Sequence, residues 1–432
     1  MSVSKSWRCK LGVMAMVSDV FRRLVAGLCV VASGAALAVA QPAEMELPDV
    51  RQAERDLVRA RWELEEIVGP RLLGLDPPPL PEVPPSRLSA EEKSLTARLL
   101  DAEPGEWRAG ERERLGELLA REGATLAAAG SRGEAVAQSE LASRGFPLLE
   151  ASRLLALRDR LAFAEGREAE LLAGLEVRLD LATRLWLQPG LFGSILGMAI
   201  HRQALQDVHA LAVRPATSRA GLVRLEALLF RWRLEVPDPA AVVAREGLLM
   251  ISPDRGAATG GELLPDEAGE AVFSAPLAQD LAELARRCRD QGCRAAAAAI
   301  ERGLLEHEDP YRVIADLMLP NLLHVLKKLA GARELTHLAR LALALRLDAL
   351  DRGGYTPELD RIASGLGLTP DEAAELVYER RPGGGARLRL VSDQVVTDAP
   401  EAHQEQLRPL LTWDLPPLSK PSEGSREDTV GY

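Results

Sequence analysis

The stretch DPYRVIADLMLPNLLHVLKKLAGARELTHLARLALALRLDALDRGGYTPELDRI, residues 309–362, decides the fold class of this chain. From Ala332 to Arg352 its apolar residues recur at steps of three and four, so they share one broad helical face. A helix with so narrow a polar stripe is packed on several sides, as the inner helices of bundles are. The pattern predicts two helices separated at Pro320, because proline lacks the N–H that a helix interior uses.

The end of this stretch carries stop and start signals. A glycine pair at residues 353–354 predicts the end of the long helix, because glycine accepts the left-handed conformation that follows many helices. Thr356, which precedes a proline, is predicted to cap a new helix. Thr369, which precedes Pro-Asp-Glu, predicts a capping box. Residues 376–392, LVYERRPGGGARLRLVS, predict a β-hairpin that turns at the glycine run.

This C-terminal pattern resembles the tail of the G-type pseudopilins of type II secretion. In that family a helix rich in alanine and leucine is followed by a glycine, a Tyr-Pro-x-x-Leu motif and a short hairpin. The matching residues here are Tyr355, Pro357 and Leu359, with one residue inserted. Together with the helical region and the Leu-Pro pair at 319–320, the arrangement is similar to a group of uncharacterised, exported, mostly helical bacterial proteins. The pilin-type N-terminal helix and the Asp-Gly-rich calcium loop of the pseudopilins have no counterpart, so filament assembly and calcium binding are not carried over.

Composition supports a mainly helical fold. The chain has 432 residues, only 4% of them aromatic, and is rich in alanine, leucine, arginine and glutamate, which favour helices. Its net charge is −11 with both signs interspersed, and no basic face suited to nucleic acid stands out. We therefore predict stacked antiparallel helical hairpins, as a bundle or short solenoid, with a small C-terminal α+β hairpin element.

Residues 1–40 are predicted to be a secretory signal peptide. Two arginines at 22–23 precede an apolar run from Leu24 to Ala38, and an Ala-Val-Ala site ends at Ala40, before Gln41. This predicts export to the periplasm or the exterior, with no stable membrane span after cleavage. The alternative is that the apolar run is kept as an uncleaved anchor, since it is nearly as long as a bilayer crossing requires.

Two cysteines, Cys288 and Cys293, remain after the predicted cleavage. In an oxidising compartment a lone pair at this spacing predicts a disulfide. One straight helix would hold the two too far apart, but Gly292 offers a break that could bring them together. Two free thiols are the alternative. A metal site lacks further ligands, since His307 lies fourteen residues on.

The chain order predicts six segments. After the signal peptide come an N-terminal helix (41–73), a proline-rich linker (74–88), a helical-hairpin body (89–308), long helices with the pseudopilin-like α+β end (309–398), and a largely disordered tail (399–432). Within the body, turns and proline breaks about forty residues apart predict two stacked hairpins. Ser89, with Glu92 three residues on, predicts a capping box at the start of the first helix there. The helices expected in the body are Ser89–Leu100, Glu106–Arg121, Gly133–Ser143, Leu148–Ala164, Arg167–Leu187, Pro189–Val213, Ala216–Leu234, Asp238–Ile251, Leu277–Arg289 and Arg294–Leu305, and residues 252–269 are expected to form a loop.

No catalytic, cofactor-binding or metal-ligating residue is assigned. The chain contains no HExxH, GxSxG, phosphate-loop or dinucleotide-binding motif. His201 and His209 are eight residues apart, whereas a helical metal pair is four apart, so ordinary core or surface roles are expected. The cluster His307-Glu308-Asp309 suits acid–base chemistry, but Asp309 as a helix cap is the plainer interpretation.

Small and aromatic residues are interpreted as packing features. The glycines at 193 and 197 are expected to permit close helix contact in the core rather than in a membrane. Trp62, Trp186 and Trp232 are expected to be core residues, although they could instead line a groove.

These observations favour a non-catalytic, exported helical scaffold or binding protein of the cell envelope, with no cofactor. A protein partner in the envelope is compatible with this interpretation, and the sequence does not determine the oligomeric state. One alternative is an unrecognised envelope hydrolase, with acidic residues near His307 or under the 252–269 loop. Another is an accessory protein of a type II secretion-like system that docks through its C-terminal hairpin.

Overall fold

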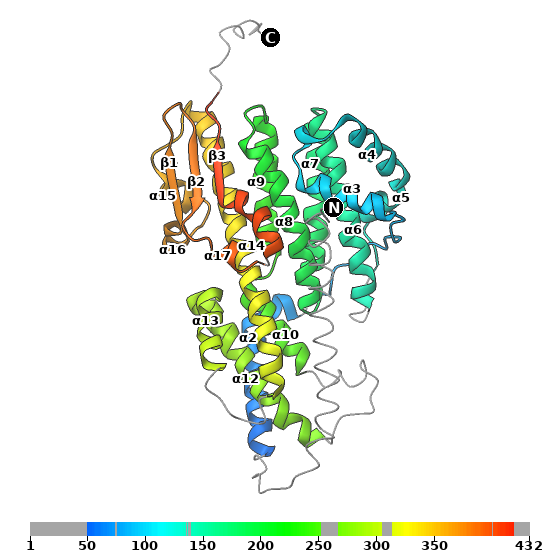
Figure 1. Cartoon of the computed structure of the whole chain (residues 1–432). Helices are drawn as coiled ribbons and strands as arrows, with labels where there is room; N and C mark the ends of the chain where they lie inside the picture. The colour runs from blue at the N-terminus through cyan, green and yellow to red at the C-terminus, as the bar shows by residue number, and fades with distance from the viewer. Residues whose placement is uncertain are drawn as a thin grey trace, which may run out of the picture.

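The computed structural model describes residues 50–73, 76–134, 136, 140–251, 267–304, 313–399 and 401–418. The predicted fold class is confirmed, because these residues form a mainly helical protein with stacked helices and one small antiparallel sheet near the C-terminus (Figure 1). Three predicted features lie outside the described residues: the signal peptide with its Ala40–Gln41 cleavage site, the His307-Glu308-Asp309 cluster, and residues 252–266 of the expected loop.

The helices form two lobes that share one long helix (Figure 1). The small lobe consists of α2 (Val50–Leu73), α10 (Pro239–Met250), α12 (Glu267–Gln291), α13 (Cys293–Leu304) and the first half of α14 (Val313–Arg352). Its own apolar cluster joins α2, α10 and α12 to residues such as Leu319 and Leu323 of α14. The small lobe therefore has a core that is separate from the cores of the other lobe.

The large lobe contains the predicted hairpin body and the C-terminal sheet. Its helical part is α3 (Ala90–Asp101), η2 (Pro104–Glu106), α4 (Ala109–Arg121), α5 (Gly123–Ala129), α6 (Leu141–Ala164), α7 (Glu168–Trp186), α8 (Leu191–Val213) and α9 (Arg219–Glu235). Its C-terminal part is the second half of α14, then α15 (Leu359–Gly365), α16 (Pro370–Ala374), β1 (Leu376–Arg380), β2 (Ala386–Leu390), α17 (Gln394–Thr397), α18 (Glu401–Leu407), η5 (Arg408–Leu411) and β3 (Thr412–Leu415).

The long helix α14 continues through Pro320, so the prediction of two helices separated there is wrong. The Pro320 side chain is exposed. The backbone hydrogen bond that proline removes therefore falls on the solvent side of the helix, where water can replace it. The helix ends as predicted: Gly353 has φ +75° and the N–H of Gly354 donates to the carbonyl of Ala349. One uninterrupted helix thus ties the two lobes together.

The four helices α6 to α9 confirm the predicted hairpins, but the predicted start at Leu148 is wrong, because α6 begins seven residues earlier and runs through Pro147. The separate helix predicted at Gly133–Ser143 is wrong. Gly133 has φ +75° and Glu134 pairs with Leu80, so the chain is extended there, and α6 begins only at Leu141. A Cβ at Gly133 would lie 2.1 Å from the backbone of Leu80, which explains why glycine occupies this crossing.

The proline-rich segment is packed against the large lobe where the structure describes it. Leu80 and Val83 are buried in the core around α6. The backbone of Leu80 exchanges two hydrogen bonds with Glu134, and the side chain of Gln188 donates to the carbonyl of Pro78 over 2.7 Å. The segment predicted as a linker between α2 and α3 is therefore held at fixed points along the body.

The C-terminal hairpin is confirmed and gains a third strand. Strands β1 and β2 pair antiparallel, and β2 also pairs with β3 in the order β1-β2-β3. The prediction of a largely disordered tail is wrong for residues 401–418. Trp413 and Leu415 of β3 are buried, and the hydroxyl of Tyr355 donates to the carbonyl of Pro416 over 2.9 Å.

Capping signals locate the short helices with one exception. The capping boxes begun by Ser89 and Thr369 are both present. Thr356 does not cap a helix directly, because α15 begins at Leu359. Its hydroxyl instead accepts a hydrogen bond from the N–H of Glu358, which forms a local turn before the helix.

Candidate functional site

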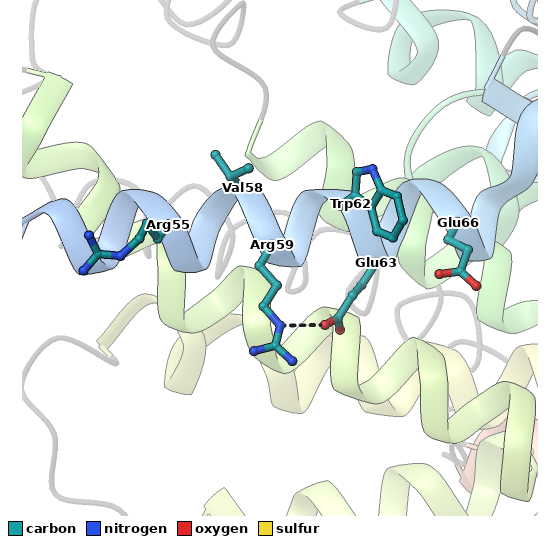
Figure 2. Close-up of a pocket in the computed structure, with 6 residues that line it drawn as sticks. All are labelled: Arg55, Val58, Arg59, Trp62, Glu63 and Glu66. Atoms are coloured by element: carbon teal, nitrogen blue, oxygen red, sulfur yellow. Dashed lines mark hydrogen bonds and ion pairs between the residues drawn. The ribbon is translucent and has the colours of Figure 1, made fainter.

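The outward face of α2 is the candidate functional site. The inner face of this helix carries Ala60, Leu64 and Val68, which are buried in the core of the small lobe. Val58 and Trp62 extend together from another side of the helix, as expected for residues four apart (Figure 2). Helix α2 is therefore apolar on two faces, and only one of them is covered by the described residues.

Trp62 exposes 71% of its surface and Val58 exposes 68%. The prediction that Trp62 is a core residue is wrong, whereas Trp186 and Trp232 are buried as expected. A tryptophan and a valine side by side in water form an apolar patch, and such patches commonly mark interaction surfaces. Helical spacing in the sequence did not distinguish the two faces of α2, because both carry large apolar residues.

Charged residues surround this apolar patch. A shallow hollow beside the helix is lined by Arg55, Val58, Arg59, Trp62, Glu63 and Glu66 (Figure 2). Arg59 forms an ion pair with Glu63, with 3.2 Å between Nε and Oε1. All six residues come from one helix, so the hollow is an open surface and not an enclosed cavity. The surface is suited to binding an apolar side chain of a partner, flanked by groups of both charges.

A buried ion-pair chain joins three helices of the large lobe. Arg178 of α7 is fully buried and contacts Asp159 of α6, with 3.0 Å between Nε and Oδ2, and Asp207 of α8, with 2.8 Å between Nη1 and Oδ2. Arg160 completes the chain at 2.8 Å from Asp207. Burial raises the pKa of Asp159, and the nearby Arg178 opposes that rise. The chain is enclosed by core residues, which is typical of a structural network.

This buried ion-pair chain was not predicted from the sequence, although the sequence contains a signal for it. Arg178 and Asp207 stand on otherwise apolar faces of their helices, and Gly174 lies one turn before Arg178. A Cβ at Gly174 would lie 1.9 Å from Oδ1 of Asp159, so glycine makes room for the carboxylate. An ionisable residue on a buried helical face usually has a charged partner.

The two helix α8 histidines are core residues, as expected. His201 stacks on Trp232 with ring centroids 3.7 Å apart, and its Nε2 is 2.8 Å from Oγ1 of Thr336. Burial lowers the pKa of His201 to about 3, so this imidazole is neutral at neutral pH. His209 lies 3.2 Å from the carbonyl of Thr412, and burial also lowers its pKa. The structure does not bring the two rings together at a common ligand.

The predicted disulfide between Cys288 and Cys293 is not formed. Both residues are free thiols, with Cys288 buried and Cys293 half-buried. The predicted helix break at Gly292 is confirmed: this residue has φ +85° and separates α12 from α13. The two thiols contact each other through a hydrogen bond, which with burial raises the pKa of Cys293. Each cysteine is held by a different helix, and the thiols meet without a covalent link.

Gly193 and Gly197 allow α8 to approach α7 closely, as predicted. A Cβ at Gly193 would lie 2.4 Å from the carbonyl oxygen of Leu185, and one at Gly197 would lie 2.6 Å from that of Ala182. This contact belongs to the core of the large lobe.

Among the described helices, none combines the length and the apolar character that a bilayer crossing needs. Within the same residues, no group of three or more His, Cys, Asp or Glu side chains is arranged to hold a metal ion.

Comparisons with models of protein families, with curated proteins and with solved structures find no match to this chain.

Proposed function

We propose that this protein is a non-catalytic, exported helical scaffold of the cell envelope, and that the outward face of α2 binds a protein partner. The observation that carries the proposal is the exposure of Trp62 beside Val58. Tryptophan and arginine are enriched at the energetically dominant positions of protein interfaces. Export is supported by the signal-peptide pattern of residues 1–40.

A protein fits this surface better than a bilayer or a nucleic acid. Val58 and Trp62 make a small apolar centre, and the residues around it include Arg55, Arg59 and Glu66 (Figure 2). A small apolar centre within a charged rim of both signs is typical of protein–protein interfaces. A nucleic acid would favour a uniformly basic surface, and an anionic membrane would favour a basic rim with a broader apolar face.

Site-specific photocrosslinking in cells tests this proposal. A photoreactive amino acid placed at Trp62 of the exported protein should give a discrete crosslinked species, whereas one at Glu117, which is exposed on α4, should not. The crosslink should be lost when Val58 is changed to Ser. Identical crosslinking from both positions, or none from position 62, would contradict the proposed surface. Removal of residues 1–40 from the exported protein, checked by N-terminal sequencing, tests the export separately.

A further inference from the structure

A second apolar stripe lies on α9, in the large lobe. Val223, Ala227, Phe230 and Leu234 are exposed and follow one another at helical steps of four, three and four. The three large side chains expose between 44% and 57% of their surface. The opposite face of α9, which includes Leu222, Leu225, Leu229 and Trp232, is buried in the core. The stripe is consequently narrow, one side chain wide along most of the helix.

Positive charge flanks this stripe. Arg224 and Arg231 share a single carboxylate, that of Glu176, at 2.8 and 3.5 Å. The guanidinium of Arg233 donates to the carbonyls of Leu366 and Gly367, which carry no net charge. The carboxylates beside the stripe are Glu176, Glu226 and Glu235. With Arg340 of α14 the arginines outnumber them by four to three, so the stripe is flanked by an excess of positive charge in a chain whose net charge is −11.

Arg340 of α14 supplies unused donors beside the stripe. Its guanidinium carbon lies 5.2 Å from the centre of the Phe230 ring. The side chain is almost fully buried, and its carboxylate partner Glu226 is at 3.5 Å from Nη2. Both Nε and Nη1 are buried without a hydrogen-bond partner among the described residues. Buried guanidinium donors are normally satisfied, so these two are open to a further acceptor.

We infer that the exposed stripe of α9 binds an acidic amphipathic helix of a partner protein. The apolar side chains of that helix would pack between Val223 and Leu234. Its carboxylates would pair with Arg224 and Arg231, and one of them would accept hydrogen bonds from Arg340 once the half-exposed Phe230 ring turns aside. Alternating steps of four and three are the spacing of the apolar seam along which two helices pack side by side.

A narrow stripe favours a helix over a bilayer. A helix that lies in a membrane interface presents a broad apolar face to the lipid. Here the rest of the apolar surface of α9 is already buried against α7 and α14. The inference does not depend on the α2 surface, which belongs to the other lobe (Figure 1). With both surfaces occupied, the scaffold would hold two partners at once.

Peptide binding to the full exported chain tests the inference. The probes are two fluorescent synthetic helices of the length of α9, with leucines at the spacing of the stripe and either glutamates or lysines on the flanks. We expect saturable binding of the glutamate peptide, seen by fluorescence anisotropy, and no saturable binding of the lysine peptide. The double change Phe230→Ser and Leu234→Ser should weaken binding at least about tenfold, as for central interface residues. Arg231→Glu should weaken it as well.

Matched controls separate this surface from the α2 surface. The double change Val58→Ser and Trp62→Ser removes an even more exposed apolar pair from α2 and should leave peptide binding unchanged. Circular dichroism melting of each variant shows whether it is folded. The inference is overturned if the glutamate peptide does not bind, or if the lysine peptide binds equally. It is also overturned if the α9 variants lose affinity for vesicles of phosphatidylglycerol and phosphatidylcholine instead, since the occupant would then be lipid.

Discussion

The guanidinium of Arg245 donates to the backbone carbonyl of Gln188 over 2.6 Å, and this bond joins the two lobes. Arg245 also donates to the carbonyls of Trp186 and Leu187, at 3.1 and 3.0 Å, which are free at the end of α7. The next residue, Glu246, accepts from the N–H of Leu191 at the start of α8 over 2.9 Å. Helix α10 of the small lobe thus caps both ends of the α7–α8 turn with charges of the sign that each end favours.

Arg245→Met should destabilise the protein by about 2–3 kcal/mol, because three carbonyls lose a charged donor. The measurement is urea unfolding followed by circular dichroism. Arg59→Met is the matched control, since it removes an exposed ion pair with Glu63, and such pairs contribute about 0–1 kcal/mol. An equal loss of unfolding free energy in the two variants would show that the hydrogen bonds from Arg245 to the end of α7 contribute little to stability.

Stability should fall as the pH is lowered from about 6.5, partly because of His201. Its pKa in the folded protein is lowered to about 3, so the unfolded chain takes up a proton that the folded chain excludes. When the pKa of a group is lower in the folded protein than in the unfolded chain, the folded state is favoured above the unfolded-chain pKa. That advantage is lost as the pH falls from the unfolded-chain value toward the folded value. Between pH 6.5 and pH 5 the loss from His201 should approach about 2 kcal/mol.

Replacing His201 by Gln tests this pH dependence. Glutamine can still reach the hydroxyl of Thr336 but does not titrate, so the change in unfolding free energy between pH 7 and pH 5 should shrink. His337, whose pKa burial lowers to about 4, should contribute in the same direction, and His337→Gln provides the comparison. An unaltered pH profile in both variants would argue against burial of neutral imidazoles.

Gly197→Ala should destabilise the protein by about 1–3 kcal/mol, as expected for overpacking. The added methyl would lie 2.6 Å from the backbone carbonyl of Ala182, which cannot move without shifting α7. Gly110→Ala is the matched control in the exposed first turn of α4, where nothing lies within 4 Å of the new methyl. That change should stabilise the helix by about 0.5–1 kcal/mol. The two melting temperatures should therefore move in opposite directions.

Cys288 and Cys293 should react slowly with iodoacetamide in the folded protein and rapidly in urea. Burial of Cys288 limits access, and the raised pKa of Cys293 keeps it as the unreactive thiol. Mass spectrometry of the alkylated protein counts the modified residues at each time point. A linked Cys288–Cys293 peptide in the non-reduced sample would contradict the pair of free thiols seen in the structure.

The sequence by itself determined the local structure. The capping boxes at Ser89 and Thr369, the glycine end of α14 and the β1–β2 hairpin were all predictable. In each case the decisive interactions join residues only a few positions apart, so the chain nearby contains the full physical cause.

Tertiary structure decided what lies inside and what stays exposed. Trp62 and Trp186 occupy similar helical patterns, yet only Trp186 is covered by other helices. Strand β3 is too short to be recognised alone, and it forms because β2 offers an open edge. The burial of the Arg340 donors and the hydrogen bonds from Arg245 to the end of α7 both depend on contacts between helices that are far apart in sequence. Burial is set by which distant segment covers a face, and no pattern within one helix carries that information.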